Sequence, residues 1–324
     1  MNDSFAGSLR QAISDARSGD AIVFAPGLTG TIKLTSGQLV INKDLKIIGP
    51  GAKVVTADAQ GLSGVFQIDD RSVVTLVGLT IMGGKAAAGG GIVVFGTLTM
   101  RDCVLRNNTA AGYGGGIVTD RGATCVIQDC TISDNSAGNY GGGTAFGPGQ
   151  VSLENCTLAG NRAGIGGGIY AYNCKLKVLS TTVCGNSASS DAAIWLQGSL
   201  TAVQVSNSII AGNAGVAGVG ECFGSFLSLG YNLIGTAGLS TGWGATGDQV
   251  GTVANPLDPK LGPLQDNGGP TPTMAPLPGS KAIDQGRRNG LSTDQRGRPR
   301  PKNFPSIPDA NYGDGSDIGA VEVQ

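Results

Sequence analysis

The stretches LTMRDCVLRNN (98–108), VIQDCTISDN (126–135), VSLENCTLAGN (151–161), LKVLSTTVCGN (176–186) and VSNSIIAGN (205–213) align with one another, and each ends in asparagine. The residues that close them are Asn108, Asn135, Asn161, Asn186 and Asn213. These asparagines follow one another at intervals of 27, 26, 25 and 27 residues. A period of this length is typical of solenoid repeats and is too short for a propeller blade.

Apolar residues alternate within each repeat, as in Leu98 and Met100 and then Cys103 and Leu105. This is the period of a strand with one buried face. A unit of about 25 residues holds three short strands and three corners, and parallel stacking of successive units pairs every strand. The sequence therefore predicts an all-β fold, a right-handed parallel β-helix (a solenoid), with roughly nine coils over residues 21–235.

Each end of such a stack is an apolar edge that invites aggregation unless it is covered. Within residues 1–20, the stretch SLRQAISDAR (8–17) places Leu9, Ala12, Ile13 and Ala16 on one helical face, and Gly19 is the expected stop. We expect this amphipathic helix to cap the first coil. Residues 236–324 are rich in proline and glycine, and we expect an irregular C-terminal segment that folds back along the last coils or the side of the rod.

Equivalent positions in successive coils should stack into columns. The asparagines are predicted to form a structural ladder at a corner, where asparagine tolerates left-handed backbone angles and its amide both donates and accepts. The alternative for this column is a ligand groove. The clusters GGGI (89–92, 114–117, 166–169) and GGGT (141–144) recur with the repeat, which favours tight corners over phosphate-binding loops.

A second predicted column points inward and consists of Cys103, Cys130, Cys156, Thr181 and Ser208. Cysteine is among the residues most often buried, so we interpret these cysteines as small core residues with free thiols. The spacing between coils also permits a disulfide between neighbours.

The composition excludes several functional classes. The 324 residues contain no histidine, which removes the usual general base and the commonest metal ligand. A formal net charge of -1 gives no electrostatic case for nucleic acid as a partner. We expect no membrane span, because no window approaches the roughly 18 apolar residues that one requires. The first residues lack the pattern of a signal peptide, so we expect the leader to be absent from this sequence.

Three acidic residues are catalytic candidates. Asp102 and Asp129 are outward neighbours of the cysteine column, and Glu154 lies on the next coil. Carboxylates one coil apart would be near the spacing used by retaining glycosidases, and a like-charged neighbour would raise the pKa of one of them. The alternative is a solvated acidic face.

Three aromatic residues are ligand-binding candidates. Tyr170 and Trp195 follow the inward residues Ile169 and Ile194, so they are predicted to face outward on adjacent coils, with Tyr172 on the same side. In a chain with only 5% aromatic residues, such a patch resembles a platform for a sugar ring or another protein. The alternative is that the C-terminal segment covers it.

Two further patterns lie in the C-terminal segment. The loop DANYGDGSD offers Asp309, Asn311, Asp314 and Asp317 as possible oxygen ligands for calcium, with turn formation as the alternative. A basic run consists of Arg287, Arg288, Arg296, Arg298, Arg300 and Lys302. We interpret it either as a surface for an acidic glycan or, with more reason, as a set of partners for acidic residues of the rod.

Several longer motifs carry a family resemblance. They are SLRQAI (8–13), IIGPGA (47–52), GYNLIG (230–235), LGPLQDNGGPTPT (261–273), LPGSKAID (277–284), DQRGRPRP (294–301) and DIGAVE (317–322). Together they resemble the choice-of-anchor Q family of bacterial surface and secreted β-helix proteins, over nearly the whole chain. The glycine and asparagine repeats also look like those of polymorphic outer-membrane proteins. The resemblance implies secretion or cell-surface display, usually through a C-terminal sorting element, which we expect to be absent from this sequence.

These observations predict an extracellular or cell-surface β-helix protein for display, adhesion or glycan binding, without catalysis and without a required cofactor. We expect a monomer whose partner is a polysaccharide or a cell-surface molecule. The alternative is a polysaccharide-active enzyme, a lyase, epimerase or hydrolase, because many parallel β-helices are such enzymes.

Overall fold

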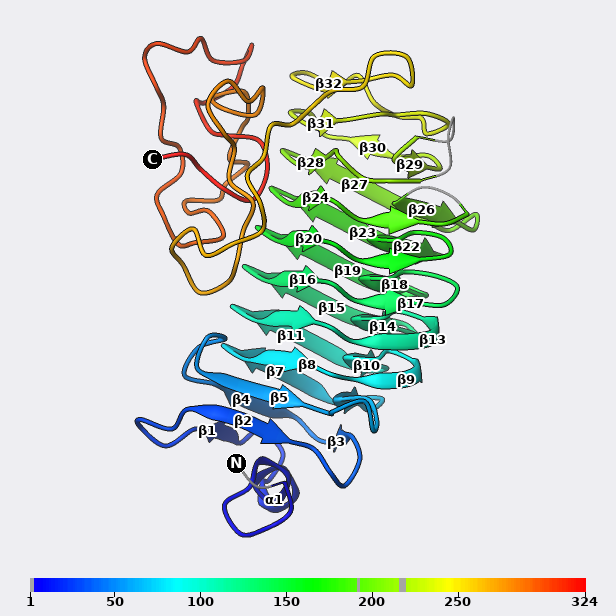
Figure 1. Ribbon diagram of the computed structural model, residues 1–324, viewed down its shortest axis with the longest axis vertical. Coiled ribbons are helices and arrows are strands. Elements are labelled where there is room, and N and C mark those ends of the chain that lie inside the picture. Colours follow the sequence, from blue (N-terminus) through cyan, green and yellow to red (C-terminus); the bar gives the residue numbers. More distant parts are fainter. Residues whose placement is uncertain (1–2, 191–192, 216–219) are drawn as a thin grey trace.

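The computed structural model describes residues 3–190, 193–215 and 220–324. Over these residues the chain winds into a rod of parallel strands, a right-handed β-solenoid of about eight turns (Figure 1). The predicted fold class is confirmed. Equivalent residues of successive turns are register partners, as Ile92 and Ile117 are, so the sequence period is the length of one turn.

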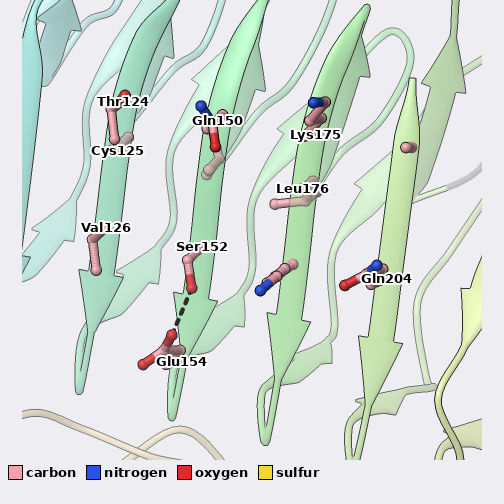
Figure 2. A pocket seen from close by; sticks show the side chains of 12 residues that line it. Thr124, Cys125, Val126, Gln150, Ser152, Glu154, Lys175, Leu176 and Gln204 are labelled. Carbon is pink, nitrogen blue, oxygen red and sulfur yellow. Dashed lines mark hydrogen bonds between the residues drawn. The ribbon is translucent and has the colours of Figure 1, made fainter. Parts of the chain in front are cut away.

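Sheet A runs along the whole rod. In spatial order its strands are β1 (Ala21–Val23), β4 (Leu45–Ile48), β7 (Val73–Val77), β11 (Thr97–Arg101), β15 (Ala123–Gln128), β19 (Gly149–Glu154), β23 (Cys174–Leu179), β27 (Ala202–Ser206) and β30 (Leu227–Ser228). Side chains alternate between the core and the outer face. Figure 2 shows outward side chains in register on neighbouring strands, among them Thr124, Gln150 and Lys175.

Sheet B follows sheet A in each turn. Its strands are β2 (Gly30–Lys33), β5 (Val55–Asp58), β8 (Thr80–Met82), β12 (Val104–Arg106), β16 (Thr131–Ser133), β20 (Thr157–Ala159), β24 (Thr182–Cys184), β28 (Ile209–Ile210), β31 (Leu233–Ile234) and β32 (Gln249–Val250).

Sheet C closes each turn, and the short sheet D lies between sheets B and C in the chain. Sheet C consists of β3 (Leu39–Ile41), β6 (Phe66–Ile68), β10 (Ile92–Val94), β14 (Ile117–Thr119), β18 (Thr144–Phe146), β22 (Ile169–Tyr172), β26 (Ile194–Gln197) and β29 (Cys222–Phe223). Sheet D consists of β9 (Lys85–Ala88), β13 (Thr109–Tyr113), β17 (Ser136–Ala137), β21 (Arg162–Ala163) and β25 (Ser187–Ala188).

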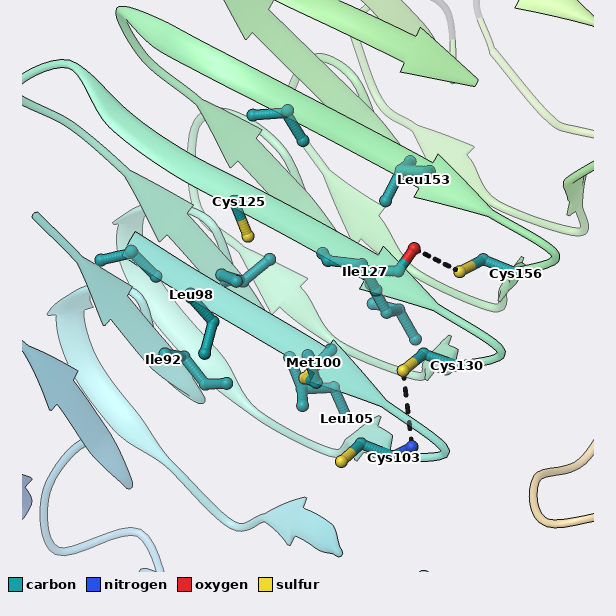
Figure 3. Close-up of a cluster of buried hydrophobic side chains, with 14 of the residues drawn as sticks. Ile92, Leu98, Met100, Cys103, Leu105, Cys125, Ile127, Cys130, Leu153 and Cys156 are labelled. Atoms are coloured by element: carbon teal, nitrogen blue, oxygen red, sulfur yellow. Dashed lines mark hydrogen bonds between the residues drawn. The ribbon is translucent and has the colours of Figure 1, made fainter. Parts of the chain in front are cut away.

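One continuous apolar cluster fills the rod from Leu9 to Ile234. The predicted cysteine column lies at its edge, and Figure 3 shows Cys103, Cys130 and Cys156 on successive turns. The backbone N–H of Cys103 donates to the Sγ atom of Cys130 at 3.4 Å. In the same way, the hydroxyl of Thr181 accepts a hydrogen bond from the backbone N–H of Cys156, also at 3.4 Å. The seven cysteines of the chain are free and buried.

The asparagine ladder is confirmed. From Asn108 to Asn213, the Nδ2 atom of each asparagine donates to the Oδ1 atom of the next at 2.8–3.0 Å. The backbone N–H of the same residue donates to that Oδ1 atom at 3.0–3.1 Å. The ladder ends on Glu221, whose Oε2 atom accepts from both nitrogens of Asn213 at 2.8 Å. Every rung is therefore fixed by two hydrogen bonds to the next turn.

The backbone at this corner differs from the prediction. The left-handed angles fall on the residue before each ladder asparagine, with φ between 53° and 73° at Asn107, Asp134, Gly160, Gly185 and Gly212. The expectation that the ladder residues themselves take these angles is wrong. Because the ladder amide must point into the stack, the chain reverses one residue earlier.

The glycine clusters form tight corners. A Cβ atom on Gly116 would lie 2.6 Å from the carbonyl oxygen of Gly143 on the next turn, which is closer than real Cβ contacts come. Gly114 has a φ of 63°, a conformation that glycine adopts without steric cost. These contacts explain why glycine recurs at this corner.

Helix α1 (Leu9–Asp15) lies at the N-terminal end of the rod (Figure 1). Leu9 and Ile13 are buried in the core cluster, as expected for a cap. The helix ends at Asp15 and not at Gly19, because Ala16 is already extended and the Lys43 ammonium donates to the carbonyl oxygens of Ile13, Ser14 and Ala16. In the described part of the chain, no helix has both the length and the apolar character to cross a membrane.

The C-terminal segment lies along the outer face of sheet B (Figure 1). The Nε2 atom of Gln295 donates to the carbonyl oxygen of Cys130 at 3.1 Å and to the hydroxyl of Thr131 at 3.0 Å, and its Oε1 atom accepts from the hydroxyl of Thr157 at 2.6 Å. The N–H of Ala320 donates to the hydroxyl of Thr182 at 3.1 Å. These threonines are in register on three neighbouring strands, and the segment buries all of them.

Candidate functional site

The candidate carboxylates do not form one stack. Asp102 and Asp129 lie on successive turns at the corner before the cysteine column, where both have left-handed backbone angles. Glu154 belongs to the neighbouring column on sheet A, in register with Gln128. The residue that follows Asp129 in its own column is Asn155, whose Nδ2 atom donates to the Asp129 carboxylate at 3.3 Å.

Burial raises the pKa of Asp129 to about 6, the hydrogen bond from Asn155 opposes this shift, and repulsion from Asp102 adds to it. Burial also raises the pKa of Asp102. The C-terminal segment lies beside this corner, because the hydroxyl of Thr271 donates to the carbonyl oxygen of Asp129 at 3.1 Å. The two aspartates are thus partly buried at a structural corner beside the C-terminal segment.

The candidate aromatic residues lie on sheet C. Tyr170 and Trp195 are register partners on β22 and β26, as the alternation predicts. The prediction that Tyr170 is exposed is wrong, because only 8% of it is accessible. Its ring packs on Tyr140 with 4.7 Å between ring centroids, and its hydroxyl donates to the Oε1 atom of Gln197 at 2.7 Å. Tyr172 is 42% exposed.

Trp195 is half-buried and stacks on Phe223, with 3.7 Å between ring centroids and 7° between ring planes. No ring contact joins it to Tyr170 among the aromatic pairs of the described residues. The predicted pair is therefore two separate stacks. The C-terminal segment bonds to sheet B, on another face of the rod from these rings.

An open groove of about 670 Å³ lies on the outer face of sheet C, and we call it the tyrosine groove. Its lining includes Val93, Phe95, Tyr113, Val118, Asp120, Tyr140, Ala145, Pro148, Tyr170, Tyr172 and Gln197. The floor is a register row of small apolar side chains, Val93, Val118 and Ala145, and the same row continues to Tyr170, whose larger ring closes the floor.

The two sides of the groove come from opposite ends of the parallel strands. Tyr113 and Tyr140 precede β14 and β18 and stack with 5.1 Å between ring centroids. Phe95 and Pro148 follow β10 and β18, and the Arg121 guanidinium lies 4.7 Å from the Phe95 ring centroid. Of these residues, sequence reasoning missed Tyr113 and Tyr140. The available signal was a tyrosine directly before the glycine cluster in two successive repeats.

The proposed calcium ligands are not brought together. Asp317 accepts from the N–H groups of Asp284 and Val323, and Asp309 accepts from the side-chain amide of Asn303. Asp314 accepts from the Ser316 hydroxyl. Within the described residues, no group of three or more histidine, cysteine, aspartate and glutamate side chains is arranged to hold a metal ion. Calcium binding by this loop stays a prediction, without support from the geometry.

The basic run pairs within its own segment. The ion pairs are Arg288–Asp314 at 3.6 Å, Arg296–Asp294 at 2.8 Å and Arg300–Glu322 at 3.0 Å. The expectation of acidic partners on the rod is wrong for these three, because each arginine pairs with an acidic residue of the C-terminal segment itself. Arg300 belongs to DQRGRPRP and Glu322 to DIGAVE, so their pair joins the two motifs. The Arg300–Glu322 pair is fully buried, so these motifs hold the segment together internally.

Comparison with known proteins agrees with this architecture. A family model for the right-handed β-helix region matches residues 63–225, about half of the chain. The chain belongs to this right-handed β-helix family. The crystal structure of pectate lyase Pel9A is similar, with a TM-score of 0.58 and 13% sequence identity, over 98% of this chain and 91% of that chain. At this identity the likeness concerns the fold alone. No match was found among curated proteins.

Proposed function

We propose that this protein is an extracellular or cell-surface β-helix that binds glycans through the tyrosine groove and does not cleave them. The observation that carries the proposal is the groove itself: an apolar floor between Tyr113 and Tyr140 on one side and Phe95 on the other. Sugar rings present apolar C–H faces, and aromatic rings offer large apolar contact area together with a polar tip. Asp120 and Gln197 add polar groups at the same groove.

The C-terminal motifs favour a finer proposal, membership of the choice-of-anchor Q group of displayed or secreted bacterial proteins. On this proposal the protein acts as a monomer and requires no cofactor. Its partner is a polysaccharide or another molecule of a cell surface.

The proposal is tested by glycan-array screening of the protein, followed by calorimetric titration of the best neutral ligand with and without EDTA. Tyr172→Ala and Tyr113→Ala remove two exposed rings of the groove, which are 42% and 45% exposed. Each should weaken binding by about tenfold, as truncation of an aromatic anchor does. The matched control is Tyr312→Ala, because Tyr312 is 87% exposed and lies in the C-terminal segment.

Circular dichroism of each variant checks that the fold is intact. Absence of binding to every neutral glycan, or an equal loss in the Tyr312→Ala control, would overturn the proposal. Polysaccharides recovered from the same incubations are assayed for new reducing ends and unsaturated products. Product formation at a catalytic rate would favour the alternative, a polysaccharide-active enzyme on this scaffold.

A further inference from the structure

A second open surface lies on the outer face of sheet A, and we call it the lysine trough (Figure 2). It has a volume of about 540 Å³ and crosses β15, β19, β23 and β27. One register row of its lining is Thr124, Gln150 and Lys175, and the next is Ser152, Lys177 and Gln204. No aromatic side chain is among its lining residues in the described chain, so its chemistry differs from that of the tyrosine groove.

The two lysines of the trough are exposed and uncompensated. Lys175 and Lys177 alternate with buried Leu176 and Val178, so both side chains leave the same face of β23, from Cα atoms roughly 7 Å apart along the strand. Neither side chain has a hydrogen bond or ion pair to any residue that the structure describes. Two adjacent cations without a protein partner favour an external anion.

The one carboxylate of the trough is already engaged. Glu154 accepts from the Ser152 hydroxyl through Oε1 and from the Gln128 side-chain amide through Oε2, each at 2.7 Å. The Oε1 atom of Gln128 in turn accepts from the Arg101 guanidinium at 2.6 Å. These hydrogen bonds hold the Glu154 carboxylate toward Gln128 on β15, on the side of β19 away from β23, and Glu154 forms no ion pair with either lysine among the described residues.

The trough continues toward the C-terminal segment. A smaller hollow of about 230 Å³ shares Lys177 and Gln204 with it and is also lined by Asn289. Asn289 is tied to the rod by a hydrogen bond from its Nδ2 atom to the Ser206 hydroxyl at 2.7 Å. Arg287 precedes Asn289 by two residues and is exposed, so the start of the basic run comes to the same end of the surface as the lysines.

From this arrangement we infer that the lysine trough binds an anionic polysaccharide chain, carboxylated or sulfated, laid along β23 between β19 and β27. Lys175 and Lys177 hold successive acidic groups, and the amides of Gln150 and Gln204 bind the hydroxyls between them. The inference goes beyond the proposed function, since it concerns another face of the rod and another ligand class. With a net charge of -1 the whole protein exerts little attraction on a polyanion, so the affinity must arise locally at this surface.

The test uses affinity electrophoresis and calorimetric titration with polygalacturonate as the carboxylated probe, dextran sulfate as the sulfated probe and dextran as the neutral one. The variant Lys175→Gln/Lys177→Gln removes both charges and keeps polar side chains. The matched control is Lys33→Gln/Lys85→Gln, which removes the same charge from exposed lysines on β2 and β9. Tyr172→Ala reports separately on the tyrosine groove.

We expect at least one polyanion to bind, dextran not to compete, and the affinity to fall with added salt. The trough variant should weaken binding about tenfold, while the control changes it less than about twofold. Binding of only one polyanion supports the site and identifies its ligand as carboxylated or sulfated. Absence of polyanion binding at low salt, or an equal loss in both double variants, would overturn the inference. We expect Tyr172→Ala to bind the polyanion unchanged, so the test of the lysine trough is independent of the test of the tyrosine groove.

Discussion

Replacing Asn161 with leucine is the sharpest test of the ladder, because this residue lies in the middle of it. Its Nδ2 atom donates to the carbonyl oxygen of Ile132 and to the Oδ1 atom of Asn186, both at 2.8 Å. Its Oδ1 atom accepts from the backbone N–H and the Nδ2 atom of Asn135, at 3.1 and 3.0 Å. All four of these hydrogen bonds are buried and all are lost in Asn161→Leu.

The magnitude follows from the groups left without a partner. The N–H of Asn135 and one of its amide hydrogens lose their acceptor, and the carbonyl oxygen of Ile132 loses a donor. A stranded buried polar group costs about 1–3 kcal/mol, so the three groups together cost about 3–9 kcal/mol, and we take about 4 kcal/mol, near the lower end. With an unfolding entropy of about 2.1 cal/mol/K per residue, a chain of this length should melt about 6 °C lower.

Thermal unfolding followed by circular dichroism or calorimetry measures this shift. Asn139→Leu is the matched control, since Asn139 is exposed and its side chain has no hydrogen bond among the described residues. Asn161→Asp separates shape from hydrogen bonding, because it keeps the shape but places a carboxylate oxygen, which cannot donate, next to the Oδ1 atom of Asn186. We expect it to cost at least as much as leucine. An unchanged melting temperature for Asn161→Leu, or an equal drop for Asn139→Leu, would refute the reasoning.

Three further predictions test the corner, the cap and the core. Burial raises the pKa of Asp129 from 3.8 to about 6, so the folded protein favours the protonated carboxyl. The contribution of this protonated group to the free energy of unfolding is fully present below pH 3.8 and is lost as the pH rises through 6. Asp129→Asn should therefore stabilise the fold by about 1 kcal/mol at pH 8, after allowance for solvent screening, and by almost nothing at pH 4; equal effects at both pH values in urea titrations would contradict this. Deletion of residues 1–18 should expose the first coil and give aggregates in size-exclusion chromatography, whereas a monodisperse truncated protein would remove the capping role of α1. The seven buried thiols should react with a thiol reagent only after unfolding, since burial raises the pKa of Cys125 and Cys174 to about 12; rapid labelling of the native protein would contradict the core assignment.

The ladder and the strand register were predictable because the repeat is long and nearly constant. When one asparagine follows another after 25–27 residues through five coils, only a stack of equivalent turns places them together. The alternation around Leu153 and Cys156 then fixes which side chains enter the core. The one-residue error in the left-handed positions arose because glycine, asparagine and aspartate all occupy that corner position, so no single residue type marks it.

The state of Tyr170 was not predictable from alternation. Alternation determines that the side chain points outward from the sheet. Neighbouring turns are only about 4.8 Å apart, which is close to the distance between the centroids of two packed aromatic rings. A large outward side chain can therefore be buried by a ring on an adjacent turn. The contact that buries Tyr170 comes from Tyr140, which lies outside the regular strands and precedes a glycine cluster.

The C-terminal segment leaves two faces of the rod, those of sheets A and C, as the proposed ligand-binding surfaces. Because its sequence is aperiodic, the place where it docks on the rod could not be predicted. Its partners on the rod are a register row of threonines directly after the predicted inward column: Thr131, Thr157 and Thr182. Hydroxyls on a solenoid surface are normally solvated, but here Gln295 and Ala320 take up their hydrogen bonds. The outer face of sheet B along β16, β20 and β24 is thereby occupied by the chain itself. The aromatic surface of sheet C and the cationic surface of sheet A remain open on two other faces of the rod. On the two proposals, an apolar sugar face and an acidic chain would therefore bind at separate sets of residues.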